Sequence, residues 1–340
     1  VINPISTYPY PDFKPERTKS YEVGINARFL NGRISFDGTF YQSNTYNQTF
    51  LSVMSPATGY SGFYVQAGNV RNRGVEMTLG YNDTFGKVNY STHLTYTANQ
   101  NKIVEMVHDY RNPIDNSLVN ITELTLKEAG DVYLREGYSM SDVFTTGILQ
   151  RGRDGKLVEE GNGYQVDRSQ RIRLGSADPD FTMGWRHDIN YKNISLGLMI
   201  TGRFGGIVTS QTQAFMDAFG VSKVSAEARD NGGVMLDGHR YDAERYYNTV
   251  GGQGLMSYYT YDATNVRLQE LSLTYSLPKK WLGDVFNNAT ISFVGRNLFM
   301  FYRKAPFDPD MNGSTGTYNR SDFFMAPSLR NLGFSIKFSL

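Results

Sequence analysis

The end of the chain, residues 328–340, alternates apolar and polar side chains without a break. The apolar positions are Leu332, Phe334, Ile336, Phe338 and Leu340. This period of two residues predicts a β-strand with one wholly apolar face. A half-buried sheet in water gives the same pattern, so one such strand does not distinguish a soluble sheet from a membrane barrel.

The same alternation recurs in eight earlier segments: 20–29, 33–40, 75–81, 88–99, 181–191, 194–204, 265–277 and 289–302. Asn31-Gly32 predicts a two-residue hairpin between the first two segments. In segment 265–277 the apolar parity changes between Leu268 and Leu271, and a β-bulge near Gln269 and Glu270 would restore a continuous apolar face. The pattern therefore predicts an all-β fold of about nine antiparallel strands.

The connections between these segments alternate in length. Short or medium connections (31–32, 82–87, 192–193 and 278–288) alternate with long ones (45–66, 100–178, 205–262 and 303–327). In an antiparallel sheet every long connection then emerges at the same end. Outer-membrane barrels combine short periplasmic turns with long extracellular loops, whereas a soluble sandwich has no reason to sort its loops in this way. The sequence thus predicts a transmembrane β-barrel segment. We expect the apolar face of its last strand to contact lipid through Leu332, Phe334, Ile336, Phe338 and Leu340.

Nine strands are odd in number and too few to close around a useful lumen. An open sheet edge in lipid would leave backbone donors and acceptors unsatisfied. We therefore expect residues 1–340 to be the C-terminal part of a larger barrel, with further strands upstream. Within the long connections we expect irregular structure at 45–66, a short helix at 120–129 and a small hairpin at 148–156.

Composition narrows the class of protein. The net charge of +1 gives no electrostatic footprint for nucleic acid, and the absence of cysteine excludes disulfides, thiolate metal sites and a cysteine nucleophile. Aromatic residues make up 14% of the chain, which suits either the aromatic girdles of a membrane barrel or a carbohydrate-handling β-protein. There is no run of eighteen apolar residues that would predict a transmembrane helix.

Motifs for catalysis or metal binding are absent or weak. Neither a G-x-S-x-G, an H-E-x-x-H nor a P-loop pattern occurs, so we expect no enzyme and no cofactor. Asp308, Asp310 and Asn312 begin a segment that is similar to a calcium loop. The twelfth position of that loop would be Asn319 rather than the bidentate Glu, which favours a purely structural loop.

Charged side chains gather on the polar parity of the strands, which we interpret as the side facing a lumen. A wet lumen or a plug surface tolerates such mixed charges, and we favour this reading over a substrate track. The loops also carry tyrosines that could stack on sugars or pack against a partner protein. The predicted lumen-facing residues are Glu22, Arg28, Arg33, Asp37, Glu76, His93, Arg186, Asp188, Arg203 and Lys337; the loop tyrosines are Tyr246, Tyr247, Tyr258, Tyr259 and Tyr261.

Several stretches resemble the C-terminal barrel of the SusC/RagA family of TonB-dependent outer-membrane transporters. The most specific are NVRLQELSLTYSLPKKWL at 265–282, GRNLF at 295–299 and APFDPD at 305–310. NVRNRGVE at 69–76, together with residues 22–24, 174–176 and 179–181, adds further blocks in the same order. The chain departs from the family in ending on Phe338-Ser339-Leu340 rather than on an aromatic residue, and in having Asp310 where the family tends to have Glu.

The resemblance implies a whole protein of about 22 strands with an N-terminal plug, neither the plug nor the N-terminal strands being in this chain. It implies import of oligosaccharides or peptides across the outer membrane of a Gram-negative, Bacteroidetes-like bacterium. The partners would be a SusD-like lipoprotein at the surface, TonB through the N-terminal region, and outer-membrane lipid. The loops at 100–178 and 205–262 would contact partner and substrate. The alternative is a similar barrel that transports nothing and acts as a scaffold for other outer-membrane proteins.

Overall fold

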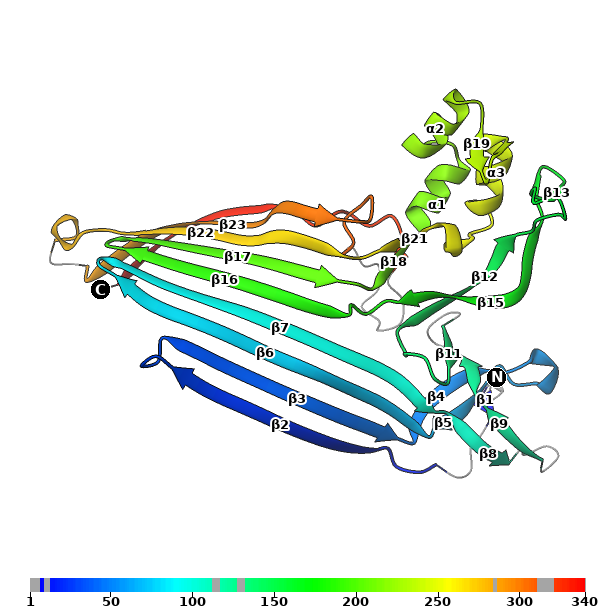
Figure 1. Cartoon of the computed structure of the whole chain (residues 1–340), viewed down its shortest axis with the longest axis horizontal. Coiled ribbons are helices and arrows are strands. Elements are labelled where there is room, and N and C mark those ends of the chain that lie inside the picture. The colour runs from blue at the N-terminus through cyan, green and yellow to red at the C-terminus, as the bar shows by residue number, and fades with distance from the viewer. Residues whose placement is uncertain are drawn as a thin grey trace, which may run out of the picture.

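A nine-stranded antiparallel sheet dominates the computed structural model, which describes residues 7–8, 13–111, 117–126, 132–283, 286–310 and 321–339 (Figure 1). The strand order follows the chain: β2-β3-β6-β7-β16-β17-β22-β23-β25. The strands are β2 (Arg17–Phe29), β3 (Ile34–Tyr46), β6 (Asn69–Phe85), β7 (Val88–Glu105), β16 (Phe181–Tyr191), β17 (Ile194–Phe204), β22 (Asn265–Ser276), β23 (Asn288–Arg303) and β25 (Asn331–Ser339). These are the nine strands that the alternation predicts.

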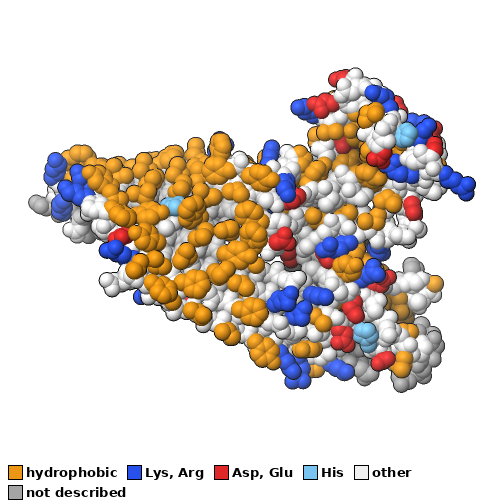
Figure 2. All heavy atoms as spheres, viewed as in Figure 1, with side chains coloured by type: hydrophobic (Ala, Val, Ile, Leu, Met, Phe, Trp, Pro, Cys, Tyr) orange, Lys and Arg blue, Asp and Glu red, His pale blue; other side chains and the backbone are white. Residues whose placement is uncertain are grey.

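The register of the sheet gathers the apolar parity of every strand on one face. One row of directly opposed residues runs Ile189, Leu196, Leu273, Phe293 and Phe334 across five neighbouring strands. None of these five side chains is fully buried. Figure 2 shows a broad hydrophobic surface over the sheet. On β25, the predicted apolar residues Leu332, Phe334, Ile336 and Phe338 are all exposed on this chain, and Leu340 lies outside the described residues.

A β-bulge in β22 keeps this apolar face continuous, as predicted. Leu268 lies opposite Ile200 and Glu270 lies opposite Met199, so Gln269 is the extra residue that has no partner on β17. The register between β22 and β23 shifts at the same place. Leu268 and Leu271 therefore both point to the apolar side although they differ in parity.

The turns at the other end of the sheet are short. Gly86-Lys87 and Lys192-Asn193 each join two strands directly, because Phe85 pairs with Val88 and Tyr191 pairs with Ile194. The predicted two-residue turn at Asn31-Gly32 is wrong in its length. Phe29 pairs with Ile34, and the chain turns through four residues with positive φ at Leu30, Asn31 and Gly32.

The long connections fold into a separate layer at the opposite end (Figure 1). Its strands are β1 (Thr7–Tyr8), β4 (Gln48–Val53), β5 (Gly62–Ala67), β8 (Val107–Arg111), β9 (Leu118–Ile121), β10 (Glu123–Thr125), β11 (Tyr133–Arg135), β12 (Asp142–Leu149), β13 (Glu159–Glu160), β14 (Gly163–Tyr164), β15 (Val166–Ser176), β18 (Ile207–Ser210), β19 (Val234–Leu236), β20 (His239–Tyr241), β21 (Thr260–Asp262) and β24 (Ser321–Asp322). Its helical turns are η1 (Pro56–Thr58) and η2 (Met256–Tyr258), and η3 (Lys279–Trp281) lies between β22 and β23.

Three predictions for these connections can be compared with the structure. Residues 45–66 form the β4–β5 hairpin instead of an irregular loop. The helix predicted at 120–129 is wrong for the described part of that segment, where β9 and β10 are extended and pair with β8 and β11. The small hairpin at 148–156 is confirmed by an antiparallel bridge between Arg151 and Leu157.

Three helices that the alternation did not indicate stand on this layer: α1 (Gln211–Ala218), α2 (Lys223–Asp230) and α3 (Ala243–Val250). Ser210, Ser222 and Asp242 cap them by accepting hydrogen bonds from backbone amides in the first turn. A buried cluster joins α3 to the β12–β15 hairpin, with Leu149 and Tyr164 packed beside Tyr246 and Val250. In the described part of the chain, no helix has the length and apolarity needed to cross a membrane.

Candidate functional site

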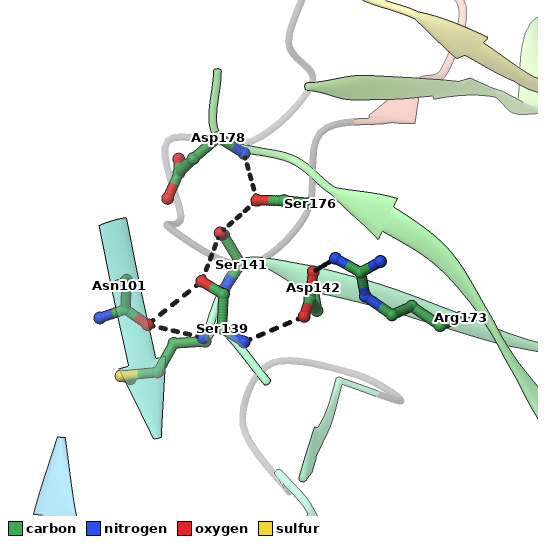
Figure 3. A network of polar contacts seen from close by, with 8 residues as sticks. Asn101, Ser139, Ser141, Asp142, Arg173, Ser176 and Asp178 are labelled. Atoms are coloured by element: carbon green, nitrogen blue, oxygen red, sulfur yellow. Dashed lines mark hydrogen bonds and ion pairs between the residues drawn. The ribbon is translucent and has the colours of Figure 1, made fainter. Parts of the chain in front are cut away.

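An ion pair between the buried Asp142 and the half-exposed Arg173 joins β12 to β15 at the base of their hairpin. The Asp142 side chain is only 2% exposed, and its Oδ1 accepts a hydrogen bond from Arg173 Nη2 at 2.7 Å (Figure 3). Its Oδ2 accepts from the backbone amide of Ser139 at 2.9 Å. The hydrogen bond to Asp142 raises the pKa of Arg173 above its ordinary value. Both carboxylate oxygens are therefore satisfied, as a buried charge requires.

A chain of hydrogen bonds continues from this pair to β7. Asn101 Oδ1 on β7 accepts from the Ser139 hydroxyl at 3.2 Å. The Ser139 hydroxyl lies 2.9 Å from that of Ser141, which in turn lies 2.9 Å from that of Ser176 (Figure 3). The Asp178 amide donates to Ser176 Oγ at 3.1 Å. This network, which the sequence analysis did not identify, ties the hairpin to the sheet beside β7 and before β16.

A cavity of about 720 Å³ opens beside the network, where β7 runs beyond its pairing with β16. Phe40, Val75 and Ala98 form its apolar wall. Arg73 and Lys102 contribute charge, together with Asp142, Arg173, Asp178 and Asp180 from the hairpin side. The cavity is thus lined by the apolar face of the sheet on one side and by ionised loop residues on the other.

A second cavity, of about 410 Å³, lies between the β12–β15 hairpin and the helices. Its lining includes Tyr133, Arg168, Arg171 and Met256. The guanidinium of Arg171 lies 4.3 Å from the ring centroid of Tyr133. Burial and a hydrogen bond to Glu123 raise the pKa of Tyr133 to about 12, so this phenol stays protonated at neutral pH. The arrangement offers cationic and aromatic contacts to a polar ligand.

The segment after β23 is held by a buried arginine. Arg267 is 6% exposed at its side chain, and its Nη2 lies 2.9 Å from Asp308 Oδ1 and 2.6 Å from Asp310 Oδ2. Burial raises the pKa of Asp308, but hydrogen bonds from Ser328, the Asp310 amide and Arg267 outweigh it and hold that pKa below its ordinary value. Both carboxylates that were weak candidates for calcium thus already face a cation.

The third member of that calcium candidate, Asn312, lies outside the described residues. Within the part of the chain that the structure describes, His, Asp and Glu side chains form no group of three or more suited to a metal ion.

The loop tyrosines pack mainly within the loop layer. Tyr246, Tyr247 and Tyr259 are buried in the cluster that joins the helices to the hairpin. Burial raises the pKa of each of the three. Tyr261 packs edge-on against Phe307, with 5.4 Å between ring centroids. Tyr258 is partly exposed, and its hydroxyl accepts a hydrogen bond from the Leu149 amide at 3.2 Å. Of these rings, Tyr258 is the one best placed to contact a ligand.

The charged residues of the polar parity lie on the face opposite the apolar surface. The register opposes His93 to Arg186, and places Asp37 opposite both Asn26 and Thr78. Arg186 pairs with Asp188 at 2.8 Å, and Arg203 donates to the Ala177 carbonyl at 2.6 Å.

The other predicted lumen-facing residues lie on this polar face or at its border. Glu22 lies opposite Tyr41, Arg28 opposite Ser35, Glu76 opposite Thr39 and Lys337 opposite Thr290. Arg33 lies in the four-residue turn, where strand parity does not define a side, and pairs with Asp83 at 3.2 Å.

Comparison with known proteins gives consistent matches. Residues 2–201 match the family described as TonB dependent receptor-like, beta-barrel. TonB-dependent receptor P3 of Formosa agariphila is 25% identical over 352 residues, which covers 96% of this chain and 34% of that protein. TonB-dependent receptor P26 of the same organism is also 25% identical, over 88% of this chain and 32% of its own length.

Solved structures share the fold. The RagAB peptide importer in its open-open state matches 98% of this chain and 36% of its own chain with a TM-score of 0.69 and 18% identity. A further structure of the RagAB peptide transporter matches 95% of this chain with a TM-score of 0.67 and 17% identity. The chain spans about a third of the length of each of these relatives.

Proposed function

Since this chain belongs to the TonB-dependent receptor-like β-barrel family of the bacterial outer membrane, we propose that it forms the C-terminal part of a nutrient importer. The observation that carries the proposal is the division of the nine strands into one apolar and one polar face, with every long connection at one end. A water-filled lumen on the polar side and lipid on the apolar side account for that division.

In this proposal the polar face, from Glu22 on β2 to Lys337 on β25, lines the lumen, and Leu332 to Phe338 contact lipid. The rest of the protein supplies the strands that close the barrel and a plug that TonB contacts. The relatives are about three times as long as this chain, which leaves room for both parts.

The loop layer is the proposed site of substrate and partner contact. Buried clusters hold its parts together, and the cavity between hairpin and helices is lined by Tyr133, Arg168 and Arg171. We propose a SusD-like surface lipoprotein as the partner and oligosaccharides or peptides as the cargo. The likeness of fold to RagAB, a peptide importer, supports a shared architecture and leaves the cargo open.

Uptake by intact cells tests the transport proposal. A strain lacking the full-length protein would be supplied with labelled oligosaccharides or peptides, with and without complementation. Accumulation that needs both the protein and TonB is expected. Absence of uptake for every cargo, while other outer-membrane proteins still co-purify with the barrel, would instead support the scaffold alternative.

The helices allow a separate test of partner binding. The Ser210 amide donates to the Tyr259 carbonyl at 2.9 Å, so a short Gly-Ser linker can replace residues 211–258 without moving β18 or β21. The lipoprotein is expected to be lost from the purified complex, whereas exchange of the turn at residues 30–33 should leave it bound. Retention of the lipoprotein after removal of the helices and of the β12–β15 hairpin tip would contradict the proposed contact.

A further inference from the structure

The apolar face of the sheet ends, on the loop side, in an ordered series of cross-strand rows. Val23, Phe40, Val75 and Ala98 lie directly opposite one another on β2, β3, β6 and β7. Two residues further along each strand, the row is Tyr21, Gln42, Arg73 and Gln100. The next row is Lys19, Asn44, Arg71 and Lys102, which we call the basic row. All three rows share one face because each step is two residues.

The change from apolar to cationic side chains takes two rows. Each row lies about 7 Å from the next, so the basic row begins about 14 Å beyond the last apolar row. Figure 2 shows Lys and Arg side chains gathered at the loop-side edge of the hydrophobic surface, over the same strands. This position is the border at which the headgroups of a surrounding lipid leaflet lie.

The basic row holds three cations, Lys19, Arg71 and Lys102, two of which lie directly opposite each other. Arg71 and Lys102 are half-buried and directly opposed, an arrangement of like charges that destabilises a sheet. Neither they nor Lys19 forms an ion pair with a described carboxylate, and Lys19 instead lies over the ring of Tyr46 at 5.7 Å. Arg73, one row nearer the apolar surface, donates to Gln100 Oε1 at 2.8 Å. An anion from outside this chain would relieve the repulsion.

The cavity of about 720 Å³ adjoins this surface. Phe40, Val75 and Ala98 of the last apolar row line it together with Arg73 and Lys102. Beyond β7 the charge reverses, because Asp178 and Asp180 lie at the corresponding edge before β16. The cationic surface on β2, β3, β6 and β7 thus ends at a hollow that has both apolar and cationic walls.

We propose that the basic row binds the phosphate groups of anionic lipid headgroups in the leaflet nearest the loops. The phosphates lie between Arg71 and Lys102 and reach Arg73, while the acyl chains pack on Phe40 and Val75. Juxtamembrane Lys and Arg attract anionic headgroups in the same way in other membrane proteins. The proposal depends on the membrane location of the barrel and is independent of which cargo it imports.

Lipid binding by the full-length protein tests the proposal. Wild type, Arg71→Gln/Lys102→Gln and the control Lys192→Gln/Lys280→Gln would be purified in neutral detergent and titrated with lipid A or with dephosphorylated lipid A. The control removes the same number of charges at the turn side of the sheet. Native mass spectrometry measures the bound lipid, and heat-dependent gel migration verifies folding.

Wild type and the turn-side control are expected to bind lipid A equally well. The affinity of Arg71→Gln/Lys102→Gln should fall about thirtyfold. Dephosphorylated lipid A should bind all three proteins equally weakly. In lipid-free detergent the Arg71→Gln/Lys102→Gln variant should be at least as stable as wild type, since the opposed charges are gone.

Two results would overturn the proposal. Equal lipid A binding by wild type and Arg71→Gln/Lys102→Gln would exclude the row as a phosphate site. Loss of a co-purifying protein from that variant, with lipid A binding unchanged, would make the row a protein interface instead.

Discussion

Two charged side chains hold the loop layer in place, and both are almost fully buried. Asp142 lies between the hairpin strand β15 and the amide of Ser139, and Arg267 lies between β22 and the two aspartates after β23. A buried charge without its partner costs several kcal/mol, to order of magnitude. Each pair therefore fixes the position of a connection that would otherwise be free to move.

Replacing Asp142 by alanine should loosen the β12–β15 hairpin. The change leaves the Ser139 amide and the Arg173 guanidinium without their acceptor, which should cost roughly 1–3 kcal/mol of local stability. Hydrogen exchange at residues 138–143 should accelerate accordingly, while Arg171→Gln on the same hairpin should have little effect there. Unchanged protection of these amides in Asp142→Ala would contradict the role of the ion pair.

Acid should release the segment held by Arg267. The pKa of Asp308 is lower in the folded than in the unfolded chain, so its carboxylate stabilises the fold above its ordinary pKa of 3.8. This contribution is lost as the pH falls below about 4 and through the folded pKa. Proteolysis of residues 305–310 should therefore increase in acid. Asp308→Asn should be cleaved faster at neutral pH and show a weaker pH dependence; a profile as steep as that of wild type would count against the assignment.

At the scale of elements, the bulge in β22 allows one strand to place side chains on both faces of the sheet as the fold requires. Leu268 and Leu271 must both face the apolar side, while Arg267 must reach Asp308 on the opposite side. In a regular strand of this sequence, only one half could turn its leucines to the apolar face. The extra residue, Gln269, lets Leu268 and Leu271 both lie on the apolar face while Arg267 lies on the polar face.

Deleting Gln269 should disrupt assembly of the barrel. The deletion would turn Arg267 toward the apolar face and away from its two aspartates, which should cost about 3–5 kcal/mol for the broken pair alone. The amount of heat-modifiable barrel in the membrane should fall sharply, whereas Gln269→Ala, which keeps the residue count, should assemble normally. Normal assembly of the deletion variant would show that the bulge is dispensable.

The sheet could be predicted from the sequence because every strand has one face of each kind, so the period of two residues is unbroken over long segments. Gln269 was predictable because the same pattern changes parity there. The loop layer was not predictable in this way. Its strands are short and its helices pack through aromatic residues such as Tyr246, which also occur in loops. The caps Ser210, Ser222 and Asp242 were a local signal for helices.

The candidate site was harder to predict than the fold. Asp142 and Arg173 are 31 residues apart, and Asn101 is 38 residues from Ser139, so their contacts depend on how the hairpin returns to β7. Sequence alone identified the residues of each strand face. It did not show that Tyr246, Tyr247 and Tyr259 would be needed for the core of the loop layer itself.

For the whole molecule, the two faces of the sheet meet different solvents in the proposed barrel. This chain has no cysteine, which allows single thiols to report on each face. In a cysteine-free full-length protein, Ser335→Cys should react with a water-soluble maleimide through the lumen. Phe334→Cys, its neighbour on β25, should react only with a lipid-soluble reagent. Equal labelling of both positions by the water-soluble reagent would contradict the assignment of faces.

The hydrogen bond between the Ser210 amide and the Tyr259 carbonyl brings together the two ends of the segment 211–258. This geometry affects how such proteins can diversify. Residues 211–258 leave and rejoin the chain at one hydrogen bond, while the register of β17 and β22 is set elsewhere, by the bulge. Recombination can therefore exchange or lengthen this insert without disturbing the wall that supports it. New surface specificities can therefore arise at residues 211–258 while folding in the membrane continues to depend on the strands.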